Sequence, residues 1–232
     1  MVRSGFLFSY ASGYLELSIY TLYNLEYSIS QIGADQEMEI IYGHEMDKGA
    51  IEKLLLLDAR VYPSEQQGDF QSLWKRFMQN KDSYTIAQLD GEPIGYVCAF
   101  PITDELYDMI KARKMLVDTE ILPEQIKSYK RDHSYNLYII SFVIKPEYQG
   151  SEALKYILNG FANQIERLQE QGIRFNQILG HAITDQGYKL LQSLGFHTVG
   201  QVEVDSVIME TKVATVIETI RYRLQDWRPQ RT

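Results

Sequence analysis

The stretch VIKPEYQGSEALKYIL, residues 143–158, has the residue types and spacing that most directly suggest chemistry. A β-branched run meets Pro146, a short polar turn passes through Gly150, and an amphipathic helix pattern follows. A strand, a tight turn and a helix N-terminus in this order commonly aim backbone N–H groups at a phosphate. The sequence therefore predicts an anion-binding turn, although Glu152 places a negative charge inside it.

The composition sets the class of protein and of partner. The chain has 232 residues, 45% of them hydrophobic, which suits one large soluble domain or one domain with an appendage. The formal net charge is -8 and no Lys/Arg-rich run occurs, so we expect neither nucleic acid nor a membrane as a partner. An acidic surface mildly favours substrates that carry an amine.

The cysteine and histidine content argues against disulfides and metal sites. Cys98 is the single cysteine and lies in the apolar run IGYVCAF, which indicates a buried structural thiol in a reducing cytoplasm. His44, His133, His181 and His197 are scattered and lack the close pairing of zinc ligands. We therefore expect a cytoplasmic protein without a metal.

The first 37 residues form a separate region. Polar residues interrupt their apolar stretch, so neither a signal peptide nor a membrane helix is favoured. Alternation of apolar and polar residues over residues 15–29 instead predicts a strand or hairpin. We expect residues 1–37 to be a β-rich extension, which could mediate a homodimer contact.

From residue 38 onward, strand and helix patterns alternate. The predicted order of elements is β-α-α-β-β-(α)-β-α-β-α-β-β and then a last helix. The predicted strands are 38–46, 84–89, 93–100, 136–144, 175–182, 197–204 and 206–213. The predicted helices are Asp47 to Pro63, 68–80, two short helices within 103–131 divided by Pro123, Gly150 to Gly172, 184–196 capped by Thr184 or Asp185, and 214–225.

Four motifs within this order resemble the GCN5-related N-acetyltransferase (GNAT) family. The Asp90-Gly91 hairpin leading into IGYV is similar to the family's second and third strands, and FVIKPEYQG is similar to the end of its fourth strand. The helix after Gly150 is similar to the family's third helix, and GYKLLQSLGF to the end of its second motif. The resemblance covers residues 38–213 and leaves residues 214–232 as a C-terminal helix and tail.

The resemblance implies the fold and the acyl donor. It implies an α+β (α/β layered) domain with a mixed, mostly antiparallel twisted sheet and helices on both faces. The fourth and fifth strands would part to admit the pantetheine arm of acetyl-CoA, and the loop amides would bind its pyrophosphate. Carried over by position, the pantetheine strand is Phe142, Val143 and Ile144, and the pyrophosphate turn is Gln149, Gly150, Ser151, Glu152, Ala153 and Leu154.

Two residues of the turn depart from the family pattern, which usually has small residues there. The carboxylate of Glu152 would repel a pyrophosphate by about 1 kcal/mol at ~4 Å in water, unless it points to solvent. Leu154 adds bulk near the cofactor unless it turns inward to the core. The turn thus keeps its amide donors but has altered side chains.

A proton donor for the departing CoA thiolate is expected on the helix over residues 184–196. Many family members place a tyrosine four residues before the Gly-Phe pair, where this chain has Leu191. Tyr188 lies one turn earlier on the same helix face and is the candidate acid. The alternative is that Tyr188 is an ordinary packed or surface tyrosine.

A proton acceptor for the incoming amine is expected near the parted strands. His181, at the end of a predicted strand, is the best candidate because imidazole titrates near neutral pH. Alternatively, His181 is a loop histidine that bonds the backbone near Thr184. Glu203, Asp205 and Asp104 are weaker candidates, and a water chain without a dedicated residue is a further alternative.

The resemblance implies an acetyl-CoA-dependent N-acetyltransferase that moves acetyl to a primary amine by direct transfer in a ternary complex. The acceptor would be a small-molecule or peptide amine, and residues 103–131 would shape its side of the site. Two other hypotheses stay open: a catalytically degenerate GNAT fold that binds or senses a ligand without turnover, and a structural domain assembled through residues 1–37.

Overall fold

The structure is a computed structural model that describes residues 38–62, 67–114, 121–203 and 206–228. Residues 38–230 form one compact unit. The predicted extension over residues 1–37 lies outside the described residues, as does the candidate base Asp205.

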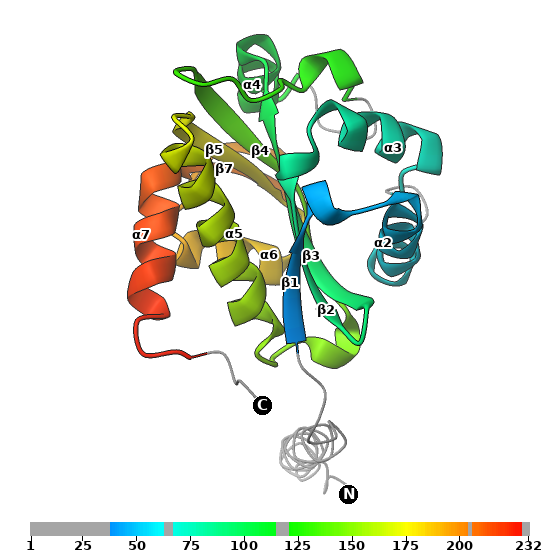
Figure 1. The fold of residues 1–232 in the computed structure, drawn as a ribbon. Coiled ribbons are helices and arrows are strands. Elements are labelled where there is room, and N and C mark those ends of the chain that lie inside the picture. Colours follow the sequence, from blue (N-terminus) through cyan, green and yellow to red (C-terminus); the bar gives the residue numbers. More distant parts are fainter. Residues whose placement is uncertain (1–37, 63–66, 115–120, 204–205, 229–232) are drawn as a thin grey trace, which may run out of the picture. The chain divides into compact units, whose positions relative to one another are not determined.

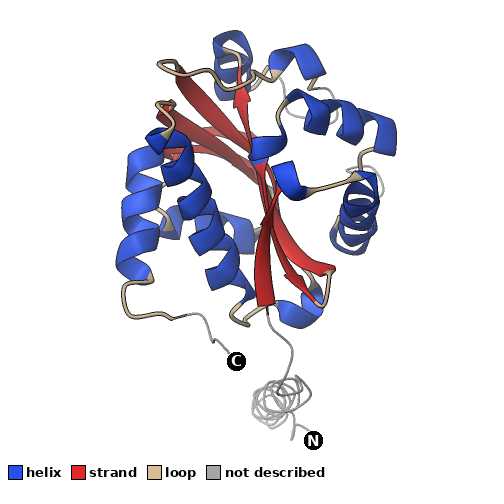
Figure 2. Ribbon diagram, in the orientation of Figure 1, coloured by secondary structure: helices blue, strands red, loops and turns tan. Residues whose placement is uncertain are grey.

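The centre of the unit is a seven-stranded sheet with the order β1-β2-β3-β4-β5-β7-β6. Every neighbouring pair is antiparallel except β4 and β5, which are parallel. The predicted mixed, mostly antiparallel sheet is therefore confirmed (Figures 1 and 2). The strands are β1 Met38–Tyr42, β2 Tyr84–Leu89, β3 Glu92–Ile102, β4 Ser134–Ile144, β5 Arg174–Ala182, β6 His197–Glu203 and β7 Ser206–Lys212.

Helices cover both faces of the sheet, as predicted (Figure 1). Two separate groups of buried apolar side chains, one on each face, hold these layers in place. The first face, here the α2 face, carries α2 Lys48–Val61, α3 Phe70–Gln79 and α4 Asp104–Lys111. The second, here the α5 face, carries α5 Ala153–Glu170, α6 Asp185–Ser193 and α7 Val213–Arg223.

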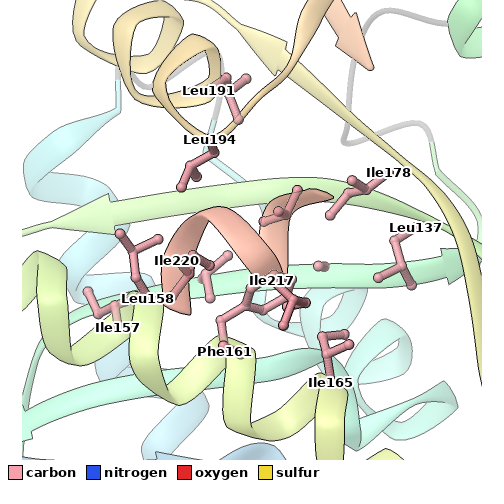
Figure 3. Packing of buried hydrophobic residues seen from close by; sticks show 14 of the residues in the cluster. Leu137, Ile157, Leu158, Phe161, Ile165, Ile178, Leu191, Leu194, Ile217 and Ile220 are labelled. Carbon is pink, nitrogen blue, oxygen red and sulfur yellow. The ribbon is translucent and has the colours of Figure 1, made fainter. Parts of the chain in front are cut away.

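The core on the α5 face follows from the apolar stripe of α5. Ile157, Phe161 and Ile165 recur at helical spacing and pack over the strands (Figure 3). Leu137 of β4 and Ile178 of β5 lie beneath them and are fully buried. This core packs α5 across β4 and β5.

Local signals set the ends of the elements. The side chain of Asp47 accepts a hydrogen bond from the Ala50 amide at 2.8 Å and caps α2. Thr184, rather than Asp185, caps α6, because its hydroxyl accepts from the Gly187 amide at 3.0 Å. The predicted hairpin turn is confirmed, and Asp90 and Gly91 both have positive φ.

The prediction of two short helices within residues 103–131 is wrong for the second one. After α4, the only helical structure among the described residues of this stretch is a single 3₁₀ turn, Pro123–Gln125. Ile126 then pairs with Ile102, and the Lys127 amide donates to the Pro101 carbonyl at 2.7 Å. Pairing with the end of β3 satisfies backbone hydrogen bonds of this segment. The charged composition of the segment gave no sign of this pairing.

The last helix, α7, packs into the same unit. The guanidinium of Arg221 donates to Asn159 and Asn163 at 2.7 Å each and to Glu166 of α5. The boundary at residue 213 between the family domain and a C-terminal helix remains a prediction. None of the described helices is long and apolar enough to cross a membrane.

Candidate functional site

The parallel pair of strands separates halfway along β4. Pairing between β4 and β5 ends at Ile139 and Gly180, whereas β4 stays paired with β3 as far as Ile144. The last five residues of β4 therefore have no strand partner on their β5 side in the described sheet. A parting of these two strands is what the sequence resemblance implied.

A bulge and a close contact lie at the point of separation. The register between β3 and β4 shifts between Cys98 and Ala99, which leaves Ile140 as an extra residue in β4. Bulges bend the strand that contains them. On β5, a Cβ atom at Gly180 would lie 2.9 Å from the side chain of Leu191, so the glycine admits this leucine to the core.

A tight turn follows β4 and leads into α5. Gln149 has φ -65° and ψ 135°, Gly150 has φ +79°, and the Ser151 amide donates to the Tyr148 carbonyl at 3.2 Å. These values describe a type II turn, whose third residue needs a positive φ and therefore favours glycine. Gly150 is thus required by the backbone rather than by packing.

Some amides of the turn are already bonded and others are open. The Ser151 amide closes the turn, and the Ala153 amide donates to the Ser151 hydroxyl at 3.2 Å. The amides of Gly150, Glu152, Leu154 and Lys155 make no hydrogen bond within the described residues. The turn therefore keeps a set of donors at a helix N-terminus, where the helix dipole also favours an anion.

The carboxylate of Glu152 is held by two donors. Lys155 lies 2.9 Å from it, and the indole N–H of Trp227 donates to it at 3.2 Å. The hydrogen bond from Lys155, and after it that from Trp227, lowers the pKa of Glu152 despite partial burial. The Trp227 ring packs edge-on against Tyr156 at 5.0 Å. The carboxylate is half-exposed, but it is fixed by these contacts rather than simply solvated.

The second departure from the family pattern, Leu154, is accommodated by the core. Its side chain is partly buried and packs against the apolar cluster of the α5 face. This is the inward orientation that the sequence left as one of two alternatives. Ala153 beside it is fully buried.

The predicted pantetheine strand presents its side chains to both faces of the sheet. Phe142 and Ile144 pack partly buried against the α5 face, whereas Val143 is fully buried in the core of the α2 face. Because all three side chains are engaged in packing, the backbone edge of β4 is the part available to a ligand. The Gln149 side chain lies 3.4 Å from the Ile144 carbonyl oxygen at the end of this edge.

The two predicted catalytic residues lie on different faces. His181 follows Gly180 on β5 and, by strand alternation, shares the α2 face with Leu179. Tyr188 lies on α6, on the α5 face, with 36% of its surface exposed. Leu191, at the position of the family's tyrosine, is 8% exposed and belongs to the core. An acid and a base on opposite faces of the sheet can serve one ligand only if it reaches both faces where β4 and β5 are no longer paired.

The weaker candidates for a base are poorly placed. The carboxylate of Asp104 is largely exposed and pairs with Lys127 at 3.2 Å. The side chain of Glu203, like all of Asp205, lies outside what the structure describes. Within the described ranges, no group of three or more metal-ligating side chains is close enough to hold a metal ion.

Sequence reasoning missed one buried acid, Asp58. Its side chain is 7% exposed, and the Tyr96 hydroxyl donates to its Oδ1 atom at 2.7 Å. Burial raises the pKa of Asp58 to about 6, with the Tyr96 hydrogen bond acting in the opposite direction. A signal was present: Asp58 follows Leu54 by four residues and Ile51 by seven, on the buried stripe of α2.

Comparison with known proteins agrees with this architecture. The described residues form an α+β fold, with helices on both faces of a mixed, mostly antiparallel sheet. The model of the acetyltransferase (GNAT) family matches residues 50–159, a range that includes β2 to β4, the turn and the first turns of α5. Over these residues the chain is similar to the acetyltransferase (GNAT) family. No curated protein matches it.

Solved structures are similar to this chain at low sequence identity. The structure of PH1933 from Pyrococcus horikoshii is 15% identical, covers 76% of this chain and 98% of its own, and superposes with a TM-score of 0.51. The PaiA N-acetyltransferase of Thermoplasma acidophilum, solved in complex with coenzyme A, is 15% identical, covers 76% and 99%, and has a TM-score of 0.45. The first of these supports the fold alone.

Proposed function

We propose that the protein is an acetyl-CoA-dependent N-acetyltransferase that acts on a primary amine. This proposal rests on two neighbouring features of the structure, a free strand edge and a turn with open amides. The free edge of β4, up to Ile144, runs directly into a turn whose amides are open. An elongated ligand with a phosphorylated end matches this arrangement, and the family match names the chemistry.

The acyl donor lies along β4 and the turn that follows it. The pantetheine arm pairs with the backbone edge of β4 between Ile140 and Ile144. The pyrophosphate lies on the open amides of Gly150, Glu152, Leu154 and Lys155, where the N-terminus of α5 compensates its charge. The ammonium of Lys155 offsets the carboxylate of Glu152, so the turn adds little net repulsion.

The acetyl group passes directly to the acceptor. The amine nitrogen attacks the thioester carbonyl carbon, the carbon–sulfur bond breaks, and CoA leaves as a thiol. His181 is the candidate proton acceptor on the α2 face, and Tyr188 is the candidate donor to the thiolate on the α5 face. Direct transfer needs no nucleophile on the protein, which agrees with a buried Cys98.

The acceptor is a small-molecule or peptide amine that enters from the α2 face. Its approach there follows from the position of the acyl donor, whose pyrophosphate end lies at α5. We further propose that the protein acts in the cytoplasm and that any homodimer forms through residues 1–37.

Isothermal titration calorimetry tests the proposal. Wild-type protein should bind CoA and acetyl-CoA, and pantetheine, which lacks the pyrophosphate, should bind at least about tenfold more weakly. Thiol release from acetyl-CoA is then followed with spermidine, kanamycin, L-methionine and the peptide Met-Ala-Ala as acceptors. Absence of CoA binding at millimolar ligand contradicts the proposal, and binding without turnover of these amines would favour a domain that only binds the cofactor.

A further inference from the structure

The carboxylate of Asp58 is buried, with 7% of the residue exposed. Among the described residues no lysine, arginine or histidine forms an ion pair with it, and its recorded side-chain hydrogen bond comes from Tyr96. Glu210 is equally buried at 7% exposure, but it accepts hydrogen bonds from Lys111 and Tyr107. An uncompensated buried carboxylate opposes folding, so its presence points to a role in function.

A chain of hydroxyl groups connects Asp58 with the free edge of β4. Tyr96 lies on β3 opposite Val143, and the Ser141 side chain is within hydrogen-bonding reach of its hydroxyl. Ser141 belongs to the part of β4 that has left β5. The chain Ser141, Tyr96, Asp58 therefore begins at the parted strands and ends inside the α2 face.

The end of α2 is also tied to the turn that follows β4. The guanidinium of Arg60 donates to both carboxylate oxygens of Glu147, at 2.9 and 3.2 Å. This pair holds the last turn of α2 next to the candidate cofactor turn. Asp58, two residues before Arg60, is thereby kept near the same end of the sheet.

Other titratable groups around Asp58 come from each neighbouring element. Tyr96 of β3 and Tyr84 of β2 interact with Asp58, and Tyr62 after α2 and Arg76 of α3 interact in turn with these two tyrosines. Burial, and then the charge of Asp58, keeps the pKa of the Tyr96 hydroxyl far above its usual range. Tyr96 is therefore protonated at neutral pH and can donate to Asp58 while it accepts a proton from elsewhere.

Resting on the proposed function, we propose that Asp58 is the terminal proton acceptor for the acceptor amine, reached through the hydroxyls of Ser141 and Tyr96. The ammonium of the acceptor gives one proton to this relay, and the Tyr96 proton moves to the Asp58 carboxylate. The neutral amine then attacks the thioester carbon. The second N–H proton leaves with the CoA thiolate, so the charges balance.

Asp58 differs from His181 in what it offers the acceptor. Both lie on the α2 face, but an ionised carboxylate attracts a cationic amine, whereas a neutral imidazole does not. The relay thus selects for acceptors that arrive as primary ammonium groups. It deprotonates the ammonium group before the acetyl group is transferred. In this scheme Asp58 acts through Tyr96 and does not touch the amine. It is therefore classed as a positioning residue.

The test compares Asp58→Asn, Tyr96→Phe and the exposed control Glu52→Gln on the same helix, each in the full chain with acetyl-CoA and the four amines named above. Asp58→Asn should lower kcat about 100-fold with the KM for acetyl-CoA changed less than about twofold. The acidic limb of the wild-type pH–rate profile should be absent in Asp58→Asn. Tyr96→Phe should likewise lower kcat and lose that limb, because phenylalanine has no hydroxyl to pass the proton on to Asp58.

Several results would overturn the relay. One is an Asp58→Asn rate within threefold of wild type. Another is an acidic limb that persists in Asp58→Asn and vanishes in His181→Asn, which would assign the base to His181. If Asp58→Asn does not fold, a Tyr96→Phe variant that keeps the wild-type kcat and acidic limb decides against the relay. Loss of CoA binding by the wild type would instead contradict the proposed function itself.

Discussion

The candidate site residues on the two faces of the sheet differ in how far apart they lie in the sequence. On the α5 face the candidate cofactor-binding residues follow one another along the chain, from Ile144 through Gly150 to Lys155. On the α2 face the polar groups come from distant segments, with Asp58 on α2, Tyr96 on β3 and His181 on β5. A site made by contiguous backbone is visible in a motif, whereas a site assembled by tertiary packing is not.

The faces also differ in how they handle charge. The α5 face leaves backbone amides open. The carboxylate of Glu152, which would repel an anion there, is fixed by Lys155 and Trp227. The α2 face buries the carboxylate of Asp58, which forms no ion pair with the described residues. The first arrangement suits an anionic cofactor, and the second suits a cationic acceptor. The four predictions below test this difference.

The largest expected effect is on stability, from Asp58→Asn. The folded-state pKa of about 6 lies above the unfolded value of 3.8, so protonation stabilises the fold, and this contribution is lost as pH rises through about 6. At pH 8 the ionised carboxylate should cost about 3 kcal/mol, an order-of-magnitude figure that Asn would recover. Urea unfolding should show Asp58→Asn more stable than wild type at pH 8, with the difference shrinking towards pH 4. Lower stability of the variant at pH 8 would show that the carboxylate stabilises the α2 face.

The next effect concerns the turn on the α5 face. Gly150 and Gly91 both have positive φ, and a Cβ atom at either would meet nothing within 4 Å. Alanine at each should therefore cost a similar ~1–2 kcal/mol of stability through backbone strain alone. Only Gly150→Ala should weaken CoA binding, by about tenfold in calorimetry, because it shifts the open amides. Equal CoA affinity in both variants would remove the turn from the cofactor site.

A smaller effect is expected from Trp227→Phe, which keeps an aromatic ring but removes the donor to Glu152. The released carboxylate should lower CoA affinity about fivefold, from a like-charge repulsion of about 1 kcal/mol. In a Glu152→Gln background the same change at Trp227 should have no effect, so the two substitutions are non-additive. An equal loss of affinity in both backgrounds would assign Trp227 a packing role only.

The smallest effect is expected for the ion pair between Arg60 and Glu147, which joins the two regions. Both side chains are about half exposed, so the pair should contribute at most about 0.5 kcal/mol, and less in high salt. Chemical denaturation of Arg60→Gln and Glu147→Gln at low and high salt measures the contribution of the ion pair to the free energy of unfolding. A loss above 2 kcal/mol in either variant would show that the two faces depend on each other for folding.

Local sequence signals were sufficient for most of the fold. The caps Asp47 and Thr184 and the hairpin at Gly91 depend only on neighbouring residues, so their patterns identify the element ends. The second helix predicted in residues 103–131 failed because the pairing of Ile126 with Ile102 competes with helix propensity and cannot be read locally.

The candidate site could be predicted only where it is contiguous. Gly150 was identified because a strand, a polar turn and a helix pattern follow one another there, and the structure adds that its φ is positive. The orientation of Glu152 depends on Trp227, 75 residues away in sequence, and no local pattern contains that contact. Asp58 carries a local signal, an acid in an apolar stripe, but its partner Tyr96 is supplied by the fold.

Backbone amide NMR of the full chain during titration with CoA tests the central claim most directly, with pantetheine as the matched control. The account predicts that the amide resonances of Gly150, Glu152, Leu154 and Lys155 shift on addition of CoA. Pantetheine should perturb residues 140–144 and leave those four amides nearly unchanged. Binding of CoA with these amides unmoved would contradict the account.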